Sequence, residues 1–174
     1  MSPRAVLVGP MGAGKTTVAE LLGEGWDQPV RDTDLDVEAR AGKPVSEIFV
    51  DEGEAHFRAL EREAVAVALR EHDGVLALGG GAVLDPTTRA LLRGQPVVFL
   101  RVGLSEAVKR VGLGTGRPLL LGNVRARVKA LLEERTPIYT EVAAVVVDTD
   151  GRSAHDVAAE VRTAIESREQ ALHG

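Results

Sequence analysis

The feature that most constrains this chain is a glycine-rich run near its amino terminus, Gly-Pro-Met-Gly-Ala-Gly-Lys-Thr at positions 9–16. The run matches G-x-x-x-x-G-K-[ST] at every fixed position, and it lies between a short apolar stretch and a helical pattern. A strand, a loop and a helix in this order point several backbone N–H groups and the positive end of the helix at one anion. The sequence therefore predicts a site for the phosphates of a nucleoside triphosphate.

Two side chains of this run have separate expected roles. Lys15 supplies a mobile cation for the outer phosphates, and the hydroxyl of Thr16 suits Mg²⁺. We expect the remaining contacts with the phosphates to come from the loop and the first turn of the helix, at Gly12, Ala13, Gly14 and Thr17.

Composition narrows the class of protein. A length of 174 residues fits one domain, which we expect to span residues 1–174. The net charge of −5 and the lack of a long Lys/Arg cluster argue against a nucleic-acid partner. The chain has no cysteine, which excludes disulfides and is compatible with a reducing cytoplasm. No apolar run approaches the ~18 residues of a membrane span. We expect a cytoplasmic monomer without a membrane partner.

Short apolar runs alternate with helical patterns, which predicts an α/β fold with a mostly parallel sheet covered on both faces. Strands are expected at residues 4–8, 29–31, 75–78, 96–102 and 144–147. Helices are expected at residues 15–23, 35–41, 46–71, 86–92, 104–111, 124–139 and 154–171, the last capped by Ser153.

Two stretches interrupt this alternation. Residues 35–72 form a largely helical insertion, which is long for a simple crossover between strands. Residues 112–123 carry four glycines around Arg117, a composition that is unlike one rigid segment. We interpret this second stretch as a lid that closes over the triphosphate and excludes water.

The second expected strand ends in Asp32-Thr-Asp34. Carboxylates at positions i and i+2 of a strand point to the same side, and at the carboxyl edge of a parallel sheet they would face the ligand crevice. One could hold Mg²⁺ through water, and the other could accept a proton from a hydroxyl. The structural alternative is a helix start, with Asp34 as the N-cap of residues 35–41. The phosphate loop favours the functional interpretation.

Three glycines, Gly79, Gly80 and Gly81, follow the third strand, where many phosphate-loop enzymes carry an acid for Mg²⁺. The metal would then depend on Thr16 and another acid, for which Asp32 is the natural candidate. Glycines also let a ligand approach the backbone closely. A tight turn is the alternative, although one glycine would suffice for it. Asp148, which ends the last strand, is a rival acid that we interpret as a turn residue of Asp-Thr-Asp-Gly.

Arginine holds planar carboxylates and phosphates through two parallel hydrogen bonds. Arg58 in the insertion, Arg117 in the expected lid and Arg135 late in a helix are the candidates, and Arg110 either is exposed or lies against a nucleotide base. The four histidines show no metal-ligand spacing, so we interpret them as surface or packing residues. Phe49 and Phe57 either line a small-molecule pocket or fill the core of the insertion.

In combination, these motifs closely resemble the shikimate kinase family from Arg4 to about Arg152. The phosphate loop alone belongs to a very large superfamily, whereas the other motifs in this order are highly specific. They are Asp-Thr-Asp at 32–34, Phe-Arg at 57–58 with Glu61, Gly-Gly-Gly-Ala at 79–82, Gly-Arg-Pro-Leu-Leu at 116–120 and Arg-Thr-Pro-Ile-Tyr at 135–139.

The resemblance implies a nucleoside-monophosphate-kinase-like fold with a five-stranded parallel sheet, and transfer of phosphate from ATP to shikimate with Mg²⁺. Asp34 would bind and activate the acceptor hydroxyl, and Asp32 would organise the water shell of Mg²⁺. The shikimate carboxylate would lie between Arg58 and Arg135, with Gly80 and its glycine neighbours beside it. Arg117 would reach the transferring phosphate, and two arginines would lie near adenine, Arg110 and Arg152.

Three other functions compete with this one. A kinase for another hydroxylated acid, such as gluconate, would also need arginines and an acid, but the Asp-Thr-Asp and triple-glycine motifs fit shikimate better. A GTPase-like switch would need Asn-Lys-x-Asp, which the sequence lacks. A nucleic-acid-dependent ATPase would need a basic face and an acid after the third strand.

Overall fold

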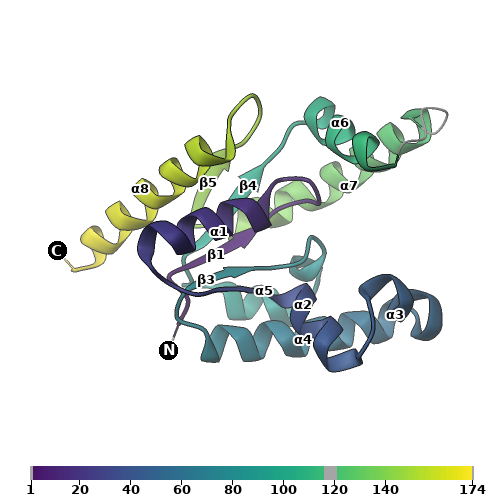
Figure 1. Ribbon diagram of the computed structural model, residues 1–174, viewed down its shortest axis with the longest axis horizontal. Coiled ribbons are helices and arrows are strands. Elements are labelled where there is room, and N and C mark those ends of the chain that lie inside the picture. Colours follow the sequence, from purple (N-terminus) through teal and green to yellow (C-terminus); the bar gives the residue numbers. More distant parts are fainter. Residues whose placement is uncertain (1, 116–120, 174) are drawn as a thin grey trace.

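A computed structural model describes residues 2–115 and 121–173 and shows a parallel sheet with helices on both faces (Figure 1). The strands are β1 (Ala5–Val8), β2 (Val30–Asp32), β3 (Val75–Ala77), β4 (Val97–Arg101) and β5 (Val145–Asp148). The helices are α1 (Lys15–Trp26), α2 (Thr33–Ala41), α3 (Val45–Glu52), α4 (Glu54–Glu71), the short 3₁₀ turn η1 (Ala82–Leu84), α5 (Pro86–Leu92), α6 (Leu104–Thr115), α7 (Leu121–Val142) and α8 (Ala154–His173).

The sheet has the strand order β2-β3-β1-β4-β5, and every neighbouring pair is parallel. In the register, Leu7 of β1 stands opposite Ala77 of β3 and Val98 of β4. This order confirms the expected five-stranded parallel sheet. Because parallel strands end at the same edge, the segments that follow β1, β2 and β3 meet there, as ligand sites in such sheets require.

The core divides along the alternation of side chains in the central strands. Ala5 and Leu7 of β1 point to one face, where α1 and α8 cover them, whereas Val6 and Val8 point to the other, toward α4, α5 and α7. Every residue of β1 and β3 is buried, as are the first four residues of β4, so both faces of these strands are covered, as predicted. The outer strands β2 and β5 are partly exposed.

The insertion differs from the expected helix over residues 46–71. It breaks at Gly53, whose φ of 87° favours glycine, into α3 and α4. Together with α2, these helices enclose a small core of their own, made of Val37, Ile48, Phe57 and Ala64. The two phenylalanines, expected either in the core of the insertion or in a pocket wall, differ in burial. Phe57 is buried, and Phe49 packs 4.7 Å from it with 37% of its surface exposed.

Helix extends into both ends of the stretch predicted as a lid. α6 runs to Thr115 and α7 begins at Leu121, so both helices are longer than their expected ranges of 104–111 and 124–139. Glycine costs a helix only about 1 kcal/mol per residue, and glycines in a helical segment are therefore tolerated. Arg117 lies outside the described residues. Among the described helices, none combines the length and apolar character needed to cross a membrane.

Candidate active site

A cavity of about 290 Å³ opens at the carboxyl ends of β1, β2 and β3, where the sheet order brings the three motifs together. It is lined by residues of the phosphate loop, both aspartates and the first two of the three glycines. These residues are Met11, Gly12, Gly14, Lys15, Thr16, Thr17, Asp32, Asp34, Ala77, Leu78, Gly79 and Gly80. Nine predicted site residues therefore share one cavity wall, and Ala13 is buried beneath the loop.

The backbone of the loop explains its glycines. Gly9, Gly12 and Gly14 have φ values of 150°, 84° and 88°, in a region that side chains other than hydrogen disfavour. A Cβ on Gly9 would also lie 2.7 Å from the carbonyl oxygen of Leu100. Gly14 is the N-cap of α1, so the first turn of this helix, with its unpaired N–H groups, faces the cavity.

Lys15 folds back over the loop that carries it. Its Nζ donates to the carbonyl oxygens of Gly9 at 2.6 Å and Pro10 at 3.0 Å. Burial lowers the pKa of Lys15 to about 8, against the opposing influence of the carboxylates of Asp34 and Asp32. The side chain is thus a cation held at some cost in the cavity, and an added negative charge there would raise its pKa again.

The two aspartates line the cavity, but their backbone positions differ from the predicted continuous strand. Asp32 ends β2 and is the N-cap of α2, because its Oδ1 accepts from the backbone N–H of Asp34 at 2.8 Å. Asp34 lies in the first turn of that helix, so the prediction of two carboxylates on one side of a strand is wrong, and so is Asp34 as the N-cap. Burial, followed by the charge of Asp32, raises the pKa of Asp34.

The triple glycine accommodates two of the side chains predicted to belong to the site. A Cβ on Gly79 would lie 2.6 Å from Oδ1 of Asp34, and a Cβ on Gly81 would lie 2.5 Å from both terminal nitrogens of Arg58. The carboxylate and the guanidinium therefore lie against the backbone of one short segment. A simple turn would not need either glycine, so the structure gives these two positions a reason of their own, the close approach of two side chains.

Gly80, between them, is fixed by α7. Its carbonyl oxygen accepts a hydrogen bond from the hydroxyl of Tyr139, which is fully buried and whose ring packs 5.0 Å from that of Phe99. Arg135 lies close enough to lower the pKa of this hydroxyl, although burial raises it overall. The same helix thus positions both the predicted carboxylate ligand and the glycine segment.

Arg58 and Arg135 converge on one region. Arg58 donates from Nη1 to Oε1 of the buried Glu61 at 2.8 Å. Burial raises the pKa of Glu61, and the positive charges of both arginines oppose this shift. Nε of Arg135 is buried and has no hydrogen-bond partner among the described residues. A buried donor without a partner favours a ligand acceptor at this position.

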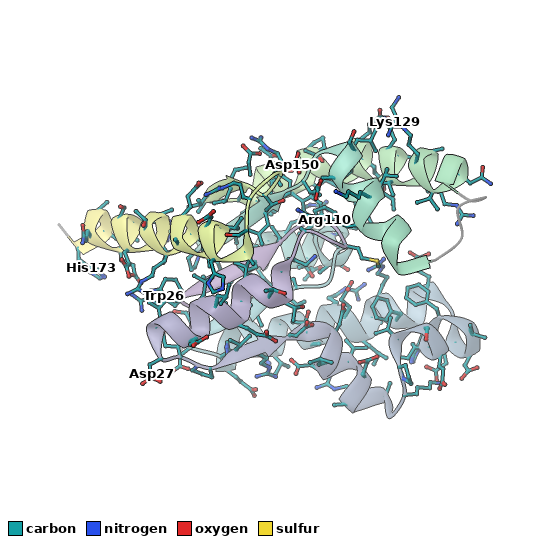
Figure 2. The ribbon with its side chains drawn as sticks, turned by 45° about the horizontal axis from the view of Figure 1, so that its top comes forward. Trp26, Asp27, Arg110, Lys129, Asp150 and His173 are labelled. Carbon is teal, nitrogen blue, oxygen red and sulfur yellow. The ribbon has the colours of Figure 1, made fainter. Side chains whose placement is uncertain are left out.

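A second cavity, of about 240 Å³, adjoins the first and shares Gly12, Gly14 and Thr17 with it. Both predicted adenine neighbours, Arg110 and Arg152, line it. Arg110 reaches from α6 toward the phosphate loop and donates to the carbonyl oxygen of Gly12 at 2.6 Å (Figure 2).

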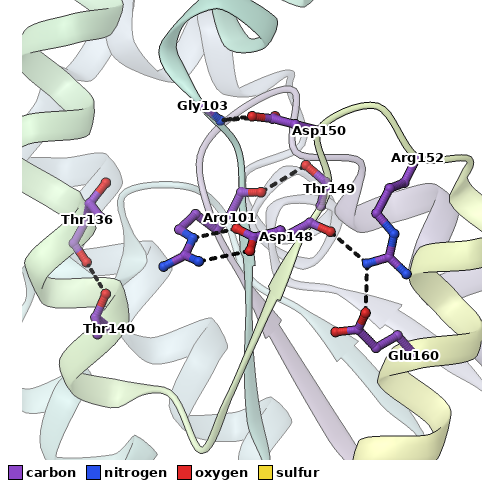
Figure 3. A network of polar contacts seen from close by, with 9 residues as sticks. All are labelled: Arg101, Gly103, Thr136, Thr140, Asp148, Thr149, Asp150, Arg152 and Glu160. Carbon is purple, nitrogen blue, oxygen red and sulfur yellow. Dashed lines mark hydrogen bonds and ion pairs between the residues drawn. The ribbon is translucent and has the colours of Figure 1, made fainter.

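The other wall of the second cavity is the β5–α8 connection (Figure 3). Arg152 donates to the carbonyl oxygen of Asp148 at 2.9 Å and pairs with Glu160 at 2.8 Å. Asp148 is the last residue of β5 and forms a two-pronged ion pair with Arg101, at 2.6 and 2.9 Å, so its interpretation as a turn residue is wrong. The exposed pair lies outside both cavities.

Sequence reasoning missed three residues that shape the site. Tyr139 was predicted to be a packing residue, which its burial confirms, and was otherwise noted only as part of a motif. Thr149, which lines the second cavity, was noted only as part of a turn. Asp150 accepts the backbone N–H of Gly103 at 3.0 Å and so joins the start of α6 to the β5–α8 connection. Contacts between segments 47 residues apart leave no local pattern from which they could have been predicted.

Comparison with known proteins gives a consistent answer. The family model described as shikimate kinase matches residues 11–166. The chain is 63% identical to the shikimate kinase of Salinispora arenicola over 92% of this chain and 96% of that protein. It is 54% identical to the shikimate kinase of Streptomyces coelicolor, over 97% and 98% of the two chains.

The chain belongs to the shikimate kinase family. Among solved structures, the shikimate kinase of Acinetobacter baumannii in complex with shikimate superposes with a TM-score of 0.87 at 34% identity, over 97% of this chain and 94% of that one. A gluconokinase from Sinorhizobium meliloti shares the fold, with a TM-score of 0.63 at 21% identity. Membership in the shikimate kinase family confirms the resemblance and the fold predicted from the motifs, and it makes this chain a kinase.

Proposed function

We propose that the two adjoining cavities form one site in which ATP donates its terminal phosphoryl group to the 3-hydroxyl of shikimate. Family membership supports shikimate phosphorylation, a step of aromatic amino acid biosynthesis. The observation that carries the residue-level proposal is the position of Asp34 and Arg58 against Gly79 and Gly81, next to the cavity that holds Lys15. A proton acceptor (Asp34), a cation that can bind a carboxylate (Arg58) and a cation that can bind phosphate (Lys15) are thereby brought together.

The nucleotide is assigned to the loop and the second cavity. The phosphates would lie on the N–H groups of Gly12, Ala13, Gly14 and the first turn of α1, with Lys15 exchanging its carbonyl partners for phosphate oxygens. Adenosine would lie between Arg110 and Arg152, the two arginines that line the second cavity. Arg117 is the proposed cation of the lid, residues 112–123, and it completes the charge around the transferring group.

Mg²⁺ fits the acids at the first cavity. No group of three or more His, Asp or Glu in the described parts of the chain could enclose a metal ion. Mg²⁺ needs no such group, because it keeps several waters and binds through one or two protein oxygens and the substrate phosphates. Thr16 and Asp32 would hold it, Asp32 with the oxygen that does not cap α2. When bound, Mg²⁺ supplies positive charge that neutralises the phosphates.

Shikimate is assigned to the side of the cavity formed by the insertion, residues 35–72. Arg58 and Arg135 would hold its carboxylate, since both bring positive charge to the same region and Nε of Arg135 has no described partner. The backbone at Gly80 would contact the ring, and Glu61 keeps Arg58 in place. Asp34 would then orient the acceptor hydroxyl.

The chemistry needs little covalent participation by the protein. Phosphoryl transfer passes through a loose transition state, so positioning and electrostatic stabilisation provide most of the rate. Asp34 accepts the hydroxyl proton late in the transfer, and Lys15 stabilises charge on the phosphoryl oxygens. We also infer a single kinase domain that acts as a monomer in the cytoplasm. The length of 174 residues fits one domain, and the lack of cysteine is compatible with a reducing compartment.

A coupled assay of ADP release with shikimate, with gluconate and without an acceptor tests the proposed function. We expect strong turnover with shikimate alone. Equal turnover without an acceptor would indicate an ATPase. Preference for gluconate would show that the acceptor is a hydroxylated acid other than shikimate. Identification of the product by ³¹P NMR and a proton-coupled correlation locates the phosphate on the 3-oxygen.

The activity should depend on pH through Asp34. Because the pKa of Asp34 is raised, its carboxylate becomes protonated at a higher pH than an ordinary aspartate, and a protonated carboxyl cannot accept the hydroxyl proton. We expect kcat/KM for shikimate to fall as the pH falls through this displaced pKa. Glu61, whose pKa is also raised by burial, is the alternative source. The acid limb should persist in Glu61→Gln; its disappearance there would assign it to Glu61.

Gly81→Ala should weaken shikimate binding without unfolding the chain. Gly81 has a φ of −99°, which alanine adopts, but the new methyl would meet the guanidinium of Arg58, the mobile end of a long side chain. Arg58 must then move, and we expect KM for shikimate to rise about tenfold, equivalent to about 1.4 kcal/mol. Gly25→Ala is the control, because the added Cβ would have only Nη1 of Arg162 near it, at 3.3 Å. An unchanged KM in folded Gly81→Ala would contradict the role of Arg58.

A further inference from the structure

A third cavity, of about 260 Å³, lies at the opposite edge of the sheet from the proposed active site. Its walls include Gln95, just before β4, and Ala144, just before β5, so it opens at the amino ends of these strands. The five residues of β4 separate it from the carboxyl edge by roughly 16 Å at 3.3 Å per residue. The proposed reaction makes no use of this cavity.

The side chains that line this cavity carry more positive than negative charge. Three arginines line it, Arg89 from α5, Arg93 just after α5 and Arg168 from α8, together with one carboxylate, that of Glu141. Within residues 2–115 and 121–173, neither Arg93 nor Arg168 forms an ion pair or a side-chain hydrogen bond, and Glu141 pairs with neither of them. This contrasts with Arg4, Arg31, Arg101, Arg152 and Arg162, each of which has a carboxylate partner.

Arg89 is oriented in advance. Its Nη1 donates to the carbonyl oxygens of Val83 at 2.8 Å and Leu84 at 2.9 Å, which fixes the guanidinium without neutralising its charge. Among the described residues, neither Nε nor Nη2 of Arg89 forms a hydrogen bond, so both can donate to a second partner. A guanidinium held in place in this way loses little conformational entropy when it binds an anion, and its planar fork matches both carboxylates and phosphates.

We propose that this cavity is a binding site for a small polyanion, a phosphorylated or polycarboxylated molecule of low molecular weight. Three arginines and one carboxylate in the lining of a single cavity favour a ligand with at least two negative charges. The volume of about 260 Å³ admits a compact ligand of this kind.

Backbone amide NMR of the full chain tests the site directly, because shifts report the position of binding. The protein is first saturated with ADP, so that its phosphate loop is occupied, and is then titrated with inorganic phosphate and, separately, with citrate. We expect the largest shifts at Gly94, Gln95, Ala143 and Ala144. Binding of phosphate alone, citrate alone or both would each support the site and would identify its ligand class. Shifts confined to the phosphate loop, or no shifts with either probe, would overturn it.

Variants test whether the arginines are responsible for binding the anionic probe. Arg93→Gln combined with Arg168→Gln should weaken binding of the probe by about tenfold or more, since each substitution removes a charge-assisted hydrogen bond to the anion. Arg162→Gln makes a matched control on the same helix, because its guanidinium pairs with Glu166 outside this cavity. Undiminished binding by the double variant, or an equal loss in Arg162→Gln, would overturn the proposal. Amide spectra of each variant establish that it is folded.

Discussion

Asp34→Asn should lower kcat for shikimate phosphorylation by about 10²–10⁴-fold, the usual contribution of a positioned general base, and leave the affinity for ATP nearly unchanged. Asparagine keeps the size of the side chain against Gly79 but cannot accept the hydroxyl proton. Steady-state kinetics with both substrates, together with equilibrium binding of ATP, measure the two effects separately. Near-normal turnover by this variant would remove Asp34 from the proposed role.

The stability of the same variant provides an internal control. The pKa of Asp34 is raised in the folded chain, so its charged form is disfavoured relative to the unfolded chain, and folding gains stability as the pH falls through that pKa. At neutral pH the neutral amide removes this unfavourable charge, and Asp34→Asn should therefore match or exceed the parent in Tm. Asp36→Asn, two residues along the same helix and paired with Arg31 at the surface, should keep its activity.

Lys15→Met should lower kcat by about 10²–10³-fold, in the range found when one preorganised electrostatic group is removed from a transition state. It should also raise KM for ATP, because the methionine cannot follow the outer phosphates. Lys129→Met is the matched control, since Lys129 is exposed on α7 and lies outside the cavities (Figure 2). Equal losses in the two variants would indicate a general effect of charge, and a small loss in Lys15→Met would assign phosphate stabilisation to other groups.

Much of the fold followed from local patterns. The five strands and the position of the phosphate loop could be predicted because apolar runs bounded by turn residues are local signals. The break at Gly53 could not, since it depends on α3 and α4 packing around Ile48 and Phe57 rather than on glycine alone. The helical ends of the expected lid were missed for a similar reason, because glycine lowers helix propensity without deciding the outcome.

The candidate site shows a different limit. The motifs named Asp34, Arg58 and the three glycines as separate elements, and only the folded chain shows that the glycines accommodate the other two. The expected geometry at Asp32 and Asp34 assumed a continuing strand, whereas Asp32 ends it by capping α2. Tyr139 gives no sequence signal beyond its aromatic ring, because its hydrogen bond to Gly80 joins residues 59 positions apart.

The hydrogen bonds from Lys15 to its own loop bear on which anions the phosphate loop can retain. An anion that binds to Lys15 must first displace its ammonium group from the carbonyl oxygens of Gly9 and Pro10. Orthophosphate would gain few contacts in exchange, whereas the triphosphate of ATP, bound as proposed, would contact the whole loop and the arginines of the second cavity. The loop is therefore expected to discriminate by length among the cell's phosphates, rejecting abundant short ones before any lid is involved.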